Sequence, residues 1–267
     1  MNTQINAWLE TTKVVKRMKK LITVLLAAML FIANSAYAGA LEDADKAYAS
    51  KNYTQALKLY KPLALKGEAS AQYNLGVMYN NGQGVIQDYA EAVKWYKLAA
   101  VQGDAYAQSN LGFMYERGQG VTQDNTEAVK WYKLAAEQGY ANGQYNLGIM
   151  YNNGQGVIQD YAEAVKWYKL AAVQGDAYAQ SNLGVMYERG QGVTQDYIAA
   201  HMWYNLAAAK QGHVAEENRD LLAKKMTPIQ IAEAQKLAKQ CLANNYKNCL
   251  PLASPPKQKS NSKKLTM

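Results

Sequence analysis

The sequence predicts an all-α fold, a solenoid of stacked helix pairs. Four tryptophans and four glycines each recur every 36 residues, which is typical of helical repeat arrays. Within one unit, apolar residues return at helical spacing along one side of each predicted helix. A single helix pair cannot bury its own apolar faces, whereas stacked pairs can. The recurring residues are Trp95, Trp131, Trp167 and Trp203, and Gly76, Gly112, Gly148 and Gly184.

The first helix of repeat 1 is predicted from about Ala69 to Tyr79, with Leu75 and Met78 on its apolar side. Gly76 lies in the middle of this helix, where glycine costs about 1 kcal/mol relative to alanine. Because a glycine returns at this position in all four repeats, we expect a neighbouring group to approach the helix closely there.

The second helix of repeat 1 is predicted to begin after Asp88, which together with Glu91 has the spacing of a capping box. Gly103 follows the helix where a left-handed terminating residue is expected. Repeats 2 and 3 carry the same pair at Asp124 and Glu127 and at Asp160 and Glu163, whereas repeat 4 keeps only the cap, Asp196.

A longer period is superposed on the first. Residues 89–110 recur without change at residues 161–182, 72 positions later, so repeats 1 and 3 differ systematically from repeats 2 and 4. The residues that alternate between the two kinds of repeat are Tyr73 and Tyr145 with Ser109 and Ser181, and Asn80 and Asn152 with Glu116 and Glu188. Positions that vary while the core stays constant are expected to face solvent.

The N-terminal 38 residues are predicted to contain an export signal. Lys19 and Lys20 precede an apolar run from Leu21 to Ala33, which is too short to span a bilayer as a helix, and Ala36-Tyr37-Ala38 is a small-x-small cleavage pattern. Met18 is the better start for such a signal. Cleavage after Ala38 would yield a periplasmic or secreted chain without a transmembrane anchor; a retained interfacial anchor is the alternative.

The ends of the array are predicted to be capped. Residues 39–67 resemble a tetratricopeptide helix pair, residues 68–212 hold the four repeats, and residues 213–253 supply C-terminal capping helices, one of which begins at Thr227 with a capping box. Cys241 and Cys249 are expected to form a structural disulfide, since a metal site would need further ligands. The basic tail, residues 254–267, is predicted to be disordered.

The formal net charge of +8 comes from the two ends of the chain. Residues 1–38 and the tail each contribute +4, while residues 39–253 carry 20 basic and 20 acidic side chains. The predicted folded part is therefore neutral, which argues against a nucleic-acid partner.

The repeat pattern, which runs from Ala71 through Leu75-Gly76 and Trp95-Tyr96 to Gly103, resembles the Sel-one-like repeat (SLR) family, a branch of the tetratricopeptide-like repeats. The resemblance covers four copies and implies a right-handed superhelix that acts as a scaffold or adaptor in protein complexes, in exported bacterial members at the envelope or with a host. One exported subgroup is assigned penicillin-binding or β-lactamase activity, which is the alternative function. That subgroup carries a cysteine pair in every repeat, whereas this chain has no cysteine before Cys241.

No catalytic motif, metal site or cofactor site is predicted, because the closest carboxylate pairs are explained as helix caps. Binding of a protein or peptide by a monomer is expected on the concave surface that the first helices line in stacked repeats. A row of asparagines there is suited to pairing with a peptide backbone, and tyrosine is a frequent interface anchor. Hydrogen bonding between helices and an ordinary solvated face are the alternatives. The candidate residues are Tyr73, Asn74, Asn110, Glu116, Tyr145, Asn146, Asn182 and Glu188.

Overall fold

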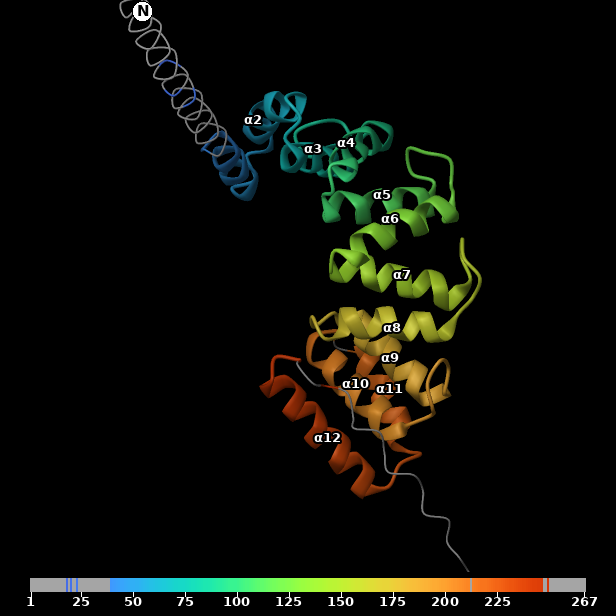
Figure 1. The fold of residues 1–267 in the computed structure, drawn as a ribbon. Helices are drawn as coiled ribbons and strands as arrows, with labels where there is room; N and C mark the ends of the chain where they lie inside the picture. The colour runs from blue at the N-terminus through green and yellow to red at the C-terminus, as the bar shows by residue number, and fades with distance from the viewer. Residues whose placement is uncertain are drawn as a thin grey trace, which may run out of the picture. The chain divides into compact units, whose positions relative to one another are not determined.

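The computed structural model describes residues 39–211, 213–246 and 249, with isolated positions 18, 20 and 23 before them. Its regular elements within these residues are all helices, drawn in Figure 1, which confirms the predicted all-α repeat fold. Most of the predicted export signal, and the predicted tail, lie outside the described residues. Among the described residues, no helix is both long enough and apolar enough to cross a membrane.

The described chain forms two compact units. Unit 1 runs to Ala107 and includes Gln119–Val121; unit 2 comprises Gln108–Gly118 and the chain from Thr122. The core of unit 1 contains Ala44, Tyr60, Leu75 and Met78. Its helices are a helix that includes residues 39–49, α2 (Tyr53–Leu65), α3 (Ala69–Asn81), α4 (Tyr89–Val101) and the start of α5 (Ala105–Arg117).

Unit 2 holds the remainder of α5 and the helices up to the C-terminal cap. Its largest apolar cluster includes Leu183, Trp203 and Leu206 together with Ala238 of the final helix, so this helix covers the core of the last repeat as expected. The helices are α6 (Asn125–Glu137), α7 (Ala141–Asn153), α8 (Tyr161–Ala172), α9 (Ala177–Arg189), α10 (Tyr197–Gln211), α11 (His213–Ala223) and α12 (Pro228–Ala243).

The recurrent mid-helix glycines each face a tyrosine ring of the following helix. A Cβ atom on Gly76 would lie 2.5 Å from Cδ1 of Tyr96, and one on Gly148 would lie 2.6 Å from Cδ1 of Tyr168. Both rings are buried. The prediction of a close neighbour at these glycines is therefore confirmed, and the neighbour is an aromatic side chain of the same repeat.

The predicted capping boxes form only in part. Asp88 caps α4, since its side chain accepts a hydrogen bond from the backbone N–H of Glu91 at 3.0 Å. The Glu91 side chain does not return to Asp88, because the Asp88 N–H donates instead to the carbonyl of Tyr79. Glu91 pairs with Lys94 at 2.8 Å. The full capping box predicted at Thr227 is present.

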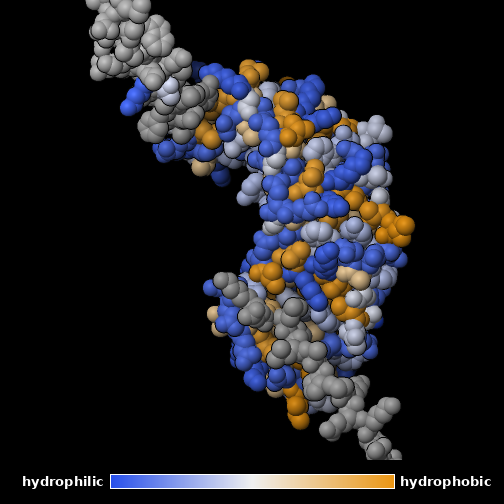
Figure 2. Space-filling model, viewed as in Figure 1, coloured by the Kyte–Doolittle hydropathy of each residue, from blue (hydrophilic) through white to orange (hydrophobic). Residues whose placement is uncertain are grey.

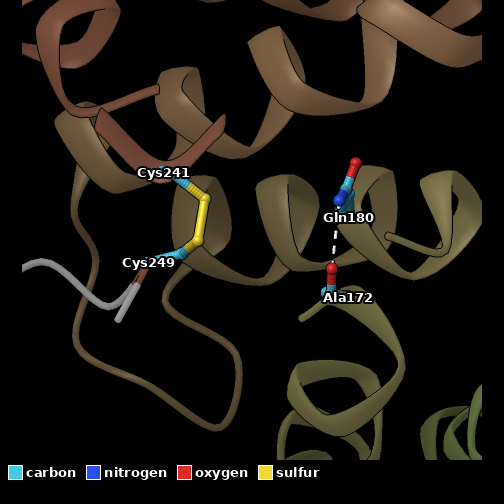
Figure 3. The surroundings of a disulfide bond; sticks show 4 residues. All are labelled: Ala172, Gln180, Cys241 and Cys249. Atoms are coloured by element: carbon cyan, nitrogen blue, oxygen red, sulfur yellow. Dashed lines mark hydrogen bonds between the residues drawn. A yellow bond between two sulfur atoms is a disulfide. The ribbon is translucent and has the colours of Figure 1, made fainter. Parts of the chain in front are cut away.

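Within each unit, buried glutamines tie a first helix to the helix pair before it. Gln144 donates from Nε2 to the carbonyl of Ala136 at 3.2 Å and accepts at Oε1 from Gln174 at 2.8 Å. Gln180 makes the equivalent bond to Ala172 at 3.0 Å (Figure 3). A buried polar group is stabilising only when it is paired in this way. The buried glutamines are Gln72, Gln108, Gln144 and Gln180.

A disulfide joins Cys241 and Cys249, which lie eight residues apart after the final repeat (Figure 3). Both cysteines are buried in the cluster around Trp203. Tyr246 lies in the loop between them, and its ring stands 5.1 Å from Nζ of Lys210, which also donates to the carbonyl of Gly175 at 2.9 Å. The disulfide thus holds a loop that contacts the end of repeat 3.

His201 provides a pH-dependent prediction. Its side chain is 2% exposed and bonds Asn205, and burial, together with the nearby Arg219, lowers the pKa of its imidazole below the ordinary value of 6.5. The unfolded chain therefore binds the proton more readily, so the free energy of unfolding falls as the pH is lowered from 7.5 through 6.5. Urea titrations at several pH values should show a smaller fall in the free energy of unfolding for His201→Gln than for the wild type. An equal dependence on pH in the two proteins would contradict the attribution of this effect to His201.

Candidate partner-binding surface

The first-helix surface of unit 1 consists of the partly or fully exposed side chains of α3 and the start of α5, and that of unit 2 of the corresponding side chains of the rest of α5, α7 and α9. The four asparagines of the predicted ladder are all half-buried. Asn74 lies 3.5 Å from Oδ1 of Asp45, and Asn182 hydrogen-bonds the Tyr168 hydroxyl. An amide has two donor hydrogens and an acceptor oxygen, so one internal bond leaves capacity for a ligand. The ladder members are Asn74, Asn110, Asn146 and Asn182.

Glu116 and Glu188 are half-buried, and the carboxylate of each is engaged by a neighbouring side chain. Glu116 accepts a hydrogen bond of 2.7 Å from the Tyr132 hydroxyl, and Glu188 accepts one of 3.0 Å from the Tyr204 hydroxyl. Burial and the adjacent carboxylate raise the pKa of Tyr132 and of Tyr204, so both phenols remain donors at neutral pH. Each glutamate therefore ties the two helices of its own repeat together.

Tyr145 belongs to an aromatic cluster in unit 2. Its ring centroid lies 5.7 Å from that of Tyr178 and 6.2 Å from that of Tyr168. Burial, with the nearby Asp176 carboxylate, raises the pKa of Tyr145 to about 12, which keeps its hydroxyl neutral. Tyr178 is 61% exposed at the start of α9. The cluster thus presents a rigid aromatic surface with hydroxyl groups at its edge, a combination common at binding interfaces.

Unit 1 carries the same arrangement 72 residues earlier. The Tyr73 ring lies 5.7 Å from that of Tyr106 and 6.1 Å from that of Tyr96. Tyr106 is exposed, as is its counterpart Tyr178. The longer repeat period therefore supplies one aromatic cluster to each unit.

A cavity of about 220 Å³ lies beside the aromatic cluster of unit 2 and shares Tyr168 with it. The ends of α7 and α9, the start of α8 and the loops that follow α7 and α9 contribute its walls. Among the described residues that line it, most are polar and none is acidic: Asn152, Asn153, Gln159, Tyr161, Tyr168, Asn182, Val185, Met186, Arg189 and Gln191.

Some exposed apolar side chains lie away from the first-helix surface. Ile86 and Ile158 are each 91% exposed in the loops after α3 and α7, where repeats 2 and 4 carry Thr122 and Thr194. On the face drawn in Figure 2, hydrophobic and hydrophilic side chains of the described residues are interspersed. Single exposed apolar residues of this kind are normal on protein surfaces.

The Sel1 repeat family model matches five consecutive segments, residues 28–68, 69–104, 105–140, 141–176 and 177–212. This chain belongs to the Sel1 repeat family. The last four segments coincide with the four predicted repeats. The first segment includes residues 39–67, the predicted tetratricopeptide-like helix pair.

Solved structures support the same Sel1 repeat fold. A Sel1 repeat protein from Oxalobacter formigenes is 34% identical, with a TM-score of 0.60, over 74% of each chain. A protective antigen of uropathogenic Escherichia coli with an SLR fold is 38% identical, with a TM-score of 0.60, over 72% of this chain and 45% of the antigen. This chain thus corresponds to less than half the length of the antigen.

Among curated proteins, HRD3 of Candida glabrata, an ERAD-associated E3 ubiquitin-protein ligase component, is 50% identical over 44 residues. This stretch is 16% of the present chain and 5% of HRD3, so it amounts to little more than one repeat. A match of this length carries no argument about the activity of the whole protein.

The structure also shows which surface residues of this Sel1 repeat protein the sequence analysis missed. Tyr106 and Tyr178 alternate with Ser70 and Asn142 in the same 72-residue rhythm as the chosen candidates. This 72-residue period could have identified both tyrosines from the sequence. Of the four recurrent tryptophans, Trp167 and Trp203 are buried and Trp95 and Trp131 are half-buried, and Trp95 packs against the core of unit 1. Among the residues that the structure describes, no group of three His, Cys, Asp or Glu side chains is placed to hold a metal ion.

Proposed function

We propose that this Sel1 repeat protein is an exported scaffold that binds a protein or peptide partner through its first-helix surface. The observation that carries the proposal is the aromatic cluster of Tyr145 and Tyr178, in which the Tyr178 ring is largely exposed, on the same helices as the half-buried Asn146 and Asn182. Rigid tyrosines supply contact area at low entropic cost, and amides pair with an extended backbone.

Several features support export. A disulfide persists in oxidising compartments, and the chain carries one between Cys241 and Cys249. The predicted cleavage after Ala38 would place the mature N-terminus at Gly39. We therefore place the protein in the bacterial periplasm or outside the cell, with a neutral folded part and no catalytic step.

A pull-down from envelope extract tests the proposal. The bait variant Tyr145→Ser, Tyr178→Ser carries at each position the residue that other repeats use, since Ser181 and Ser70 occupy the equivalent sites. We expect the wild type to retain a partner that this variant loses. The control Leu170→Ser changes an exposed residue of α8 and should retain it. Equal retention by all three baits would contradict the proposal, and turnover of nitrocefin by the pure protein would favour a cell-wall enzyme instead.

A further inference from the structure

The cavity beside α9 is too small for a whole small-molecule ligand. Its volume of about 220 Å³ lies below the roughly 300–1,000 Å³ of pockets that enclose drug-sized molecules. It has room for one side chain or for the end of a chain. Because it lies next to the aromatic cluster on the same helix, a ligand seated on that cluster is able to reach it.

The chemistry of the lining favours a negatively charged group. Arg189 is the one charged side chain among the described lining residues. Within the part of the chain that the structure describes, the side chains of Arg189 and Gln191 make no hydrogen bond or ion pair. The neighbouring Glu188 does not neutralise Arg189, since it is engaged by Tyr204 at 3.0 Å and by Lys225 at 3.0 Å. A guanidinium and a carboxylate form paired, charge-assisted hydrogen bonds, and one positive charge matches one carboxylate.

A single substitution distinguishes this site from the equivalent position on α5. Residues 105–117 and 177–189 are identical except that Phe113 is replaced by Val185. On α5, the Arg117 guanidinium lies 5.5 Å from the centroid of the Phe113 ring, a cation–π contact. On α9 the smaller Val185 lines the cavity, and no aromatic ring of the described residues lies over the guanidinium of Arg189. The sequence difference therefore leaves both space and an available cation in repeat 4.

The spacing along α9 connects the cavity to the aromatic cluster. Tyr178, Asn182, Val185 and Arg189 are separated by four, three and four residues, which places them on one face of the helix. The distance from Tyr178 to Arg189 is about 17 Å at 1.5 Å per helical residue, which about five residues of extended peptide span.

We infer that the cavity binds the carboxylate of a peptide whose extended chain lies along α9 towards Tyr178. This inference rests on the proposed function and specifies its chemistry: Arg189 and Gln191 receive the carboxylate, and Asn182 and Tyr178 contact the preceding residues. A chain terminus and an acidic side chain both supply this group, and an experiment separates them.

Three pools of random heptapeptides are passed over the immobilised full-length protein. The first pool has a free C-terminal carboxylate and no Asp or Glu; the second is amidated and contains one Glu; the third is amidated and has no acid. We expect the first or the second pool to be retained at least about tenfold better than the third, the ratio expected of a charge-assisted hydrogen-bonded pair. Preference for the first identifies a chain terminus, and preference for the second an acidic side chain.

Variants of the lining provide the decisive comparison. Val185→Phe, which copies α5, and Arg189→Gln should each reduce the retention ratio to near one while the protein remains folded by circular dichroism. Arg117→Gln, the matched change on α5, should leave the ratio unchanged, whereas Phe113→Val, which copies α9, should not lower it.

Three outcomes would overturn the inference: equal retention of all pools, no retention of any pool, or an unchanged ratio in folded Val185→Phe. If the wild type retained all three peptide pools equally and Tyr178→Ser retained none, the carboxylate site would be rejected. Peptide binding by the first-helix surface would still be supported. The pull-down with the natural partner decides the proposed function independently of the peptide pools.

Discussion

Replacing Gly148 with alanine is expected to lower the free energy of unfolding by about 1–3 kcal/mol, the usual cost of overpacking a core. The new Cβ would lie 2.6 Å from two carbons of the Tyr168 ring. That ring is 1% exposed and its hydroxyl bonds Asn182, so any displacement of the ring disturbs buried packing and this bond. The steric cost must exceed the roughly 1 kcal/mol that alanine gains in helix propensity. Urea denaturation followed by circular dichroism measures the difference.

Gly143→Ala on the same helix is the matched control. It gains the same helix propensity, and its new methyl group would meet the Cβ of Ala135 at 2.7 Å. The equivalent residues of the other repeats, Ala71, Ala107 and Ala179, are already buried alanines, so this site is expected to accommodate the methyl within about 1 kcal/mol of the wild type. If Gly148→Ala proved as stable as Gly143→Ala, contact with the tyrosine ring would not be the reason for the recurrent glycine.

Removal of the disulfide is expected to have the second large effect on the free energy of unfolding. The double change of Cys241 and Cys249 to alanine is expected to cost about 2–4 kcal/mol, because the closed loop no longer restricts the unfolded chain. The loss should be concentrated in α12 and the Tyr246 loop, whose contacts with Lys210 depend on the loop being held. Thermal unfolding with and without a thiol reductant provides the measurement.

The reductant also supplies the control for this second prediction. Reduced wild type should unfold at nearly the same temperature as the double variant, and the double variant itself should not respond to the reductant. A wild-type protein whose unfolding temperature is insensitive to the reductant would show that the cap is held by the packing of Ala238 and its neighbours alone.

The fold could be predicted because its determinants are periodic. The mid-helix glycines and the four tryptophans each recur every 36 residues, which a stacked array of repeats explains. A glycine in the middle of a helix also implies that a neighbouring group lies close to it. The identity of that neighbour, the Tyr96 ring, required the structure. The capping box at Asp88 forms only in part for a related reason. The loop brings the Tyr79 carbonyl to the Asp88 N–H, nine residues away, and no local pattern encodes this contact.

The candidate site was only partly predictable. Alternation singled out Tyr145, which lies in the aromatic cluster, and the same signal would have found Tyr178. Alternation also selected Glu116, whose carboxylate is engaged by Tyr132 on the following helix. The difference between Phe113 and Val185 is visible in the sequence, yet its meaning depends on where Arg117 and Arg189 lie. Periodicity identifies positions that vary; it does not show whether a varying side chain faces solvent or a neighbour.

The central claim is that the first-helix surface of unit 2 contacts the partner. A photocrosslinking residue placed at position 178 on α9, and separately at position 166 on the exposed side of α8, tests this claim in cells that produce the protein. Both positions are exposed, so neither replacement should disturb the core. We predict a discrete crosslinked adduct from position 178 that is absent from position 166. Adducts of the same size and yield from both positions, or an adduct from position 166 alone, would contradict the account.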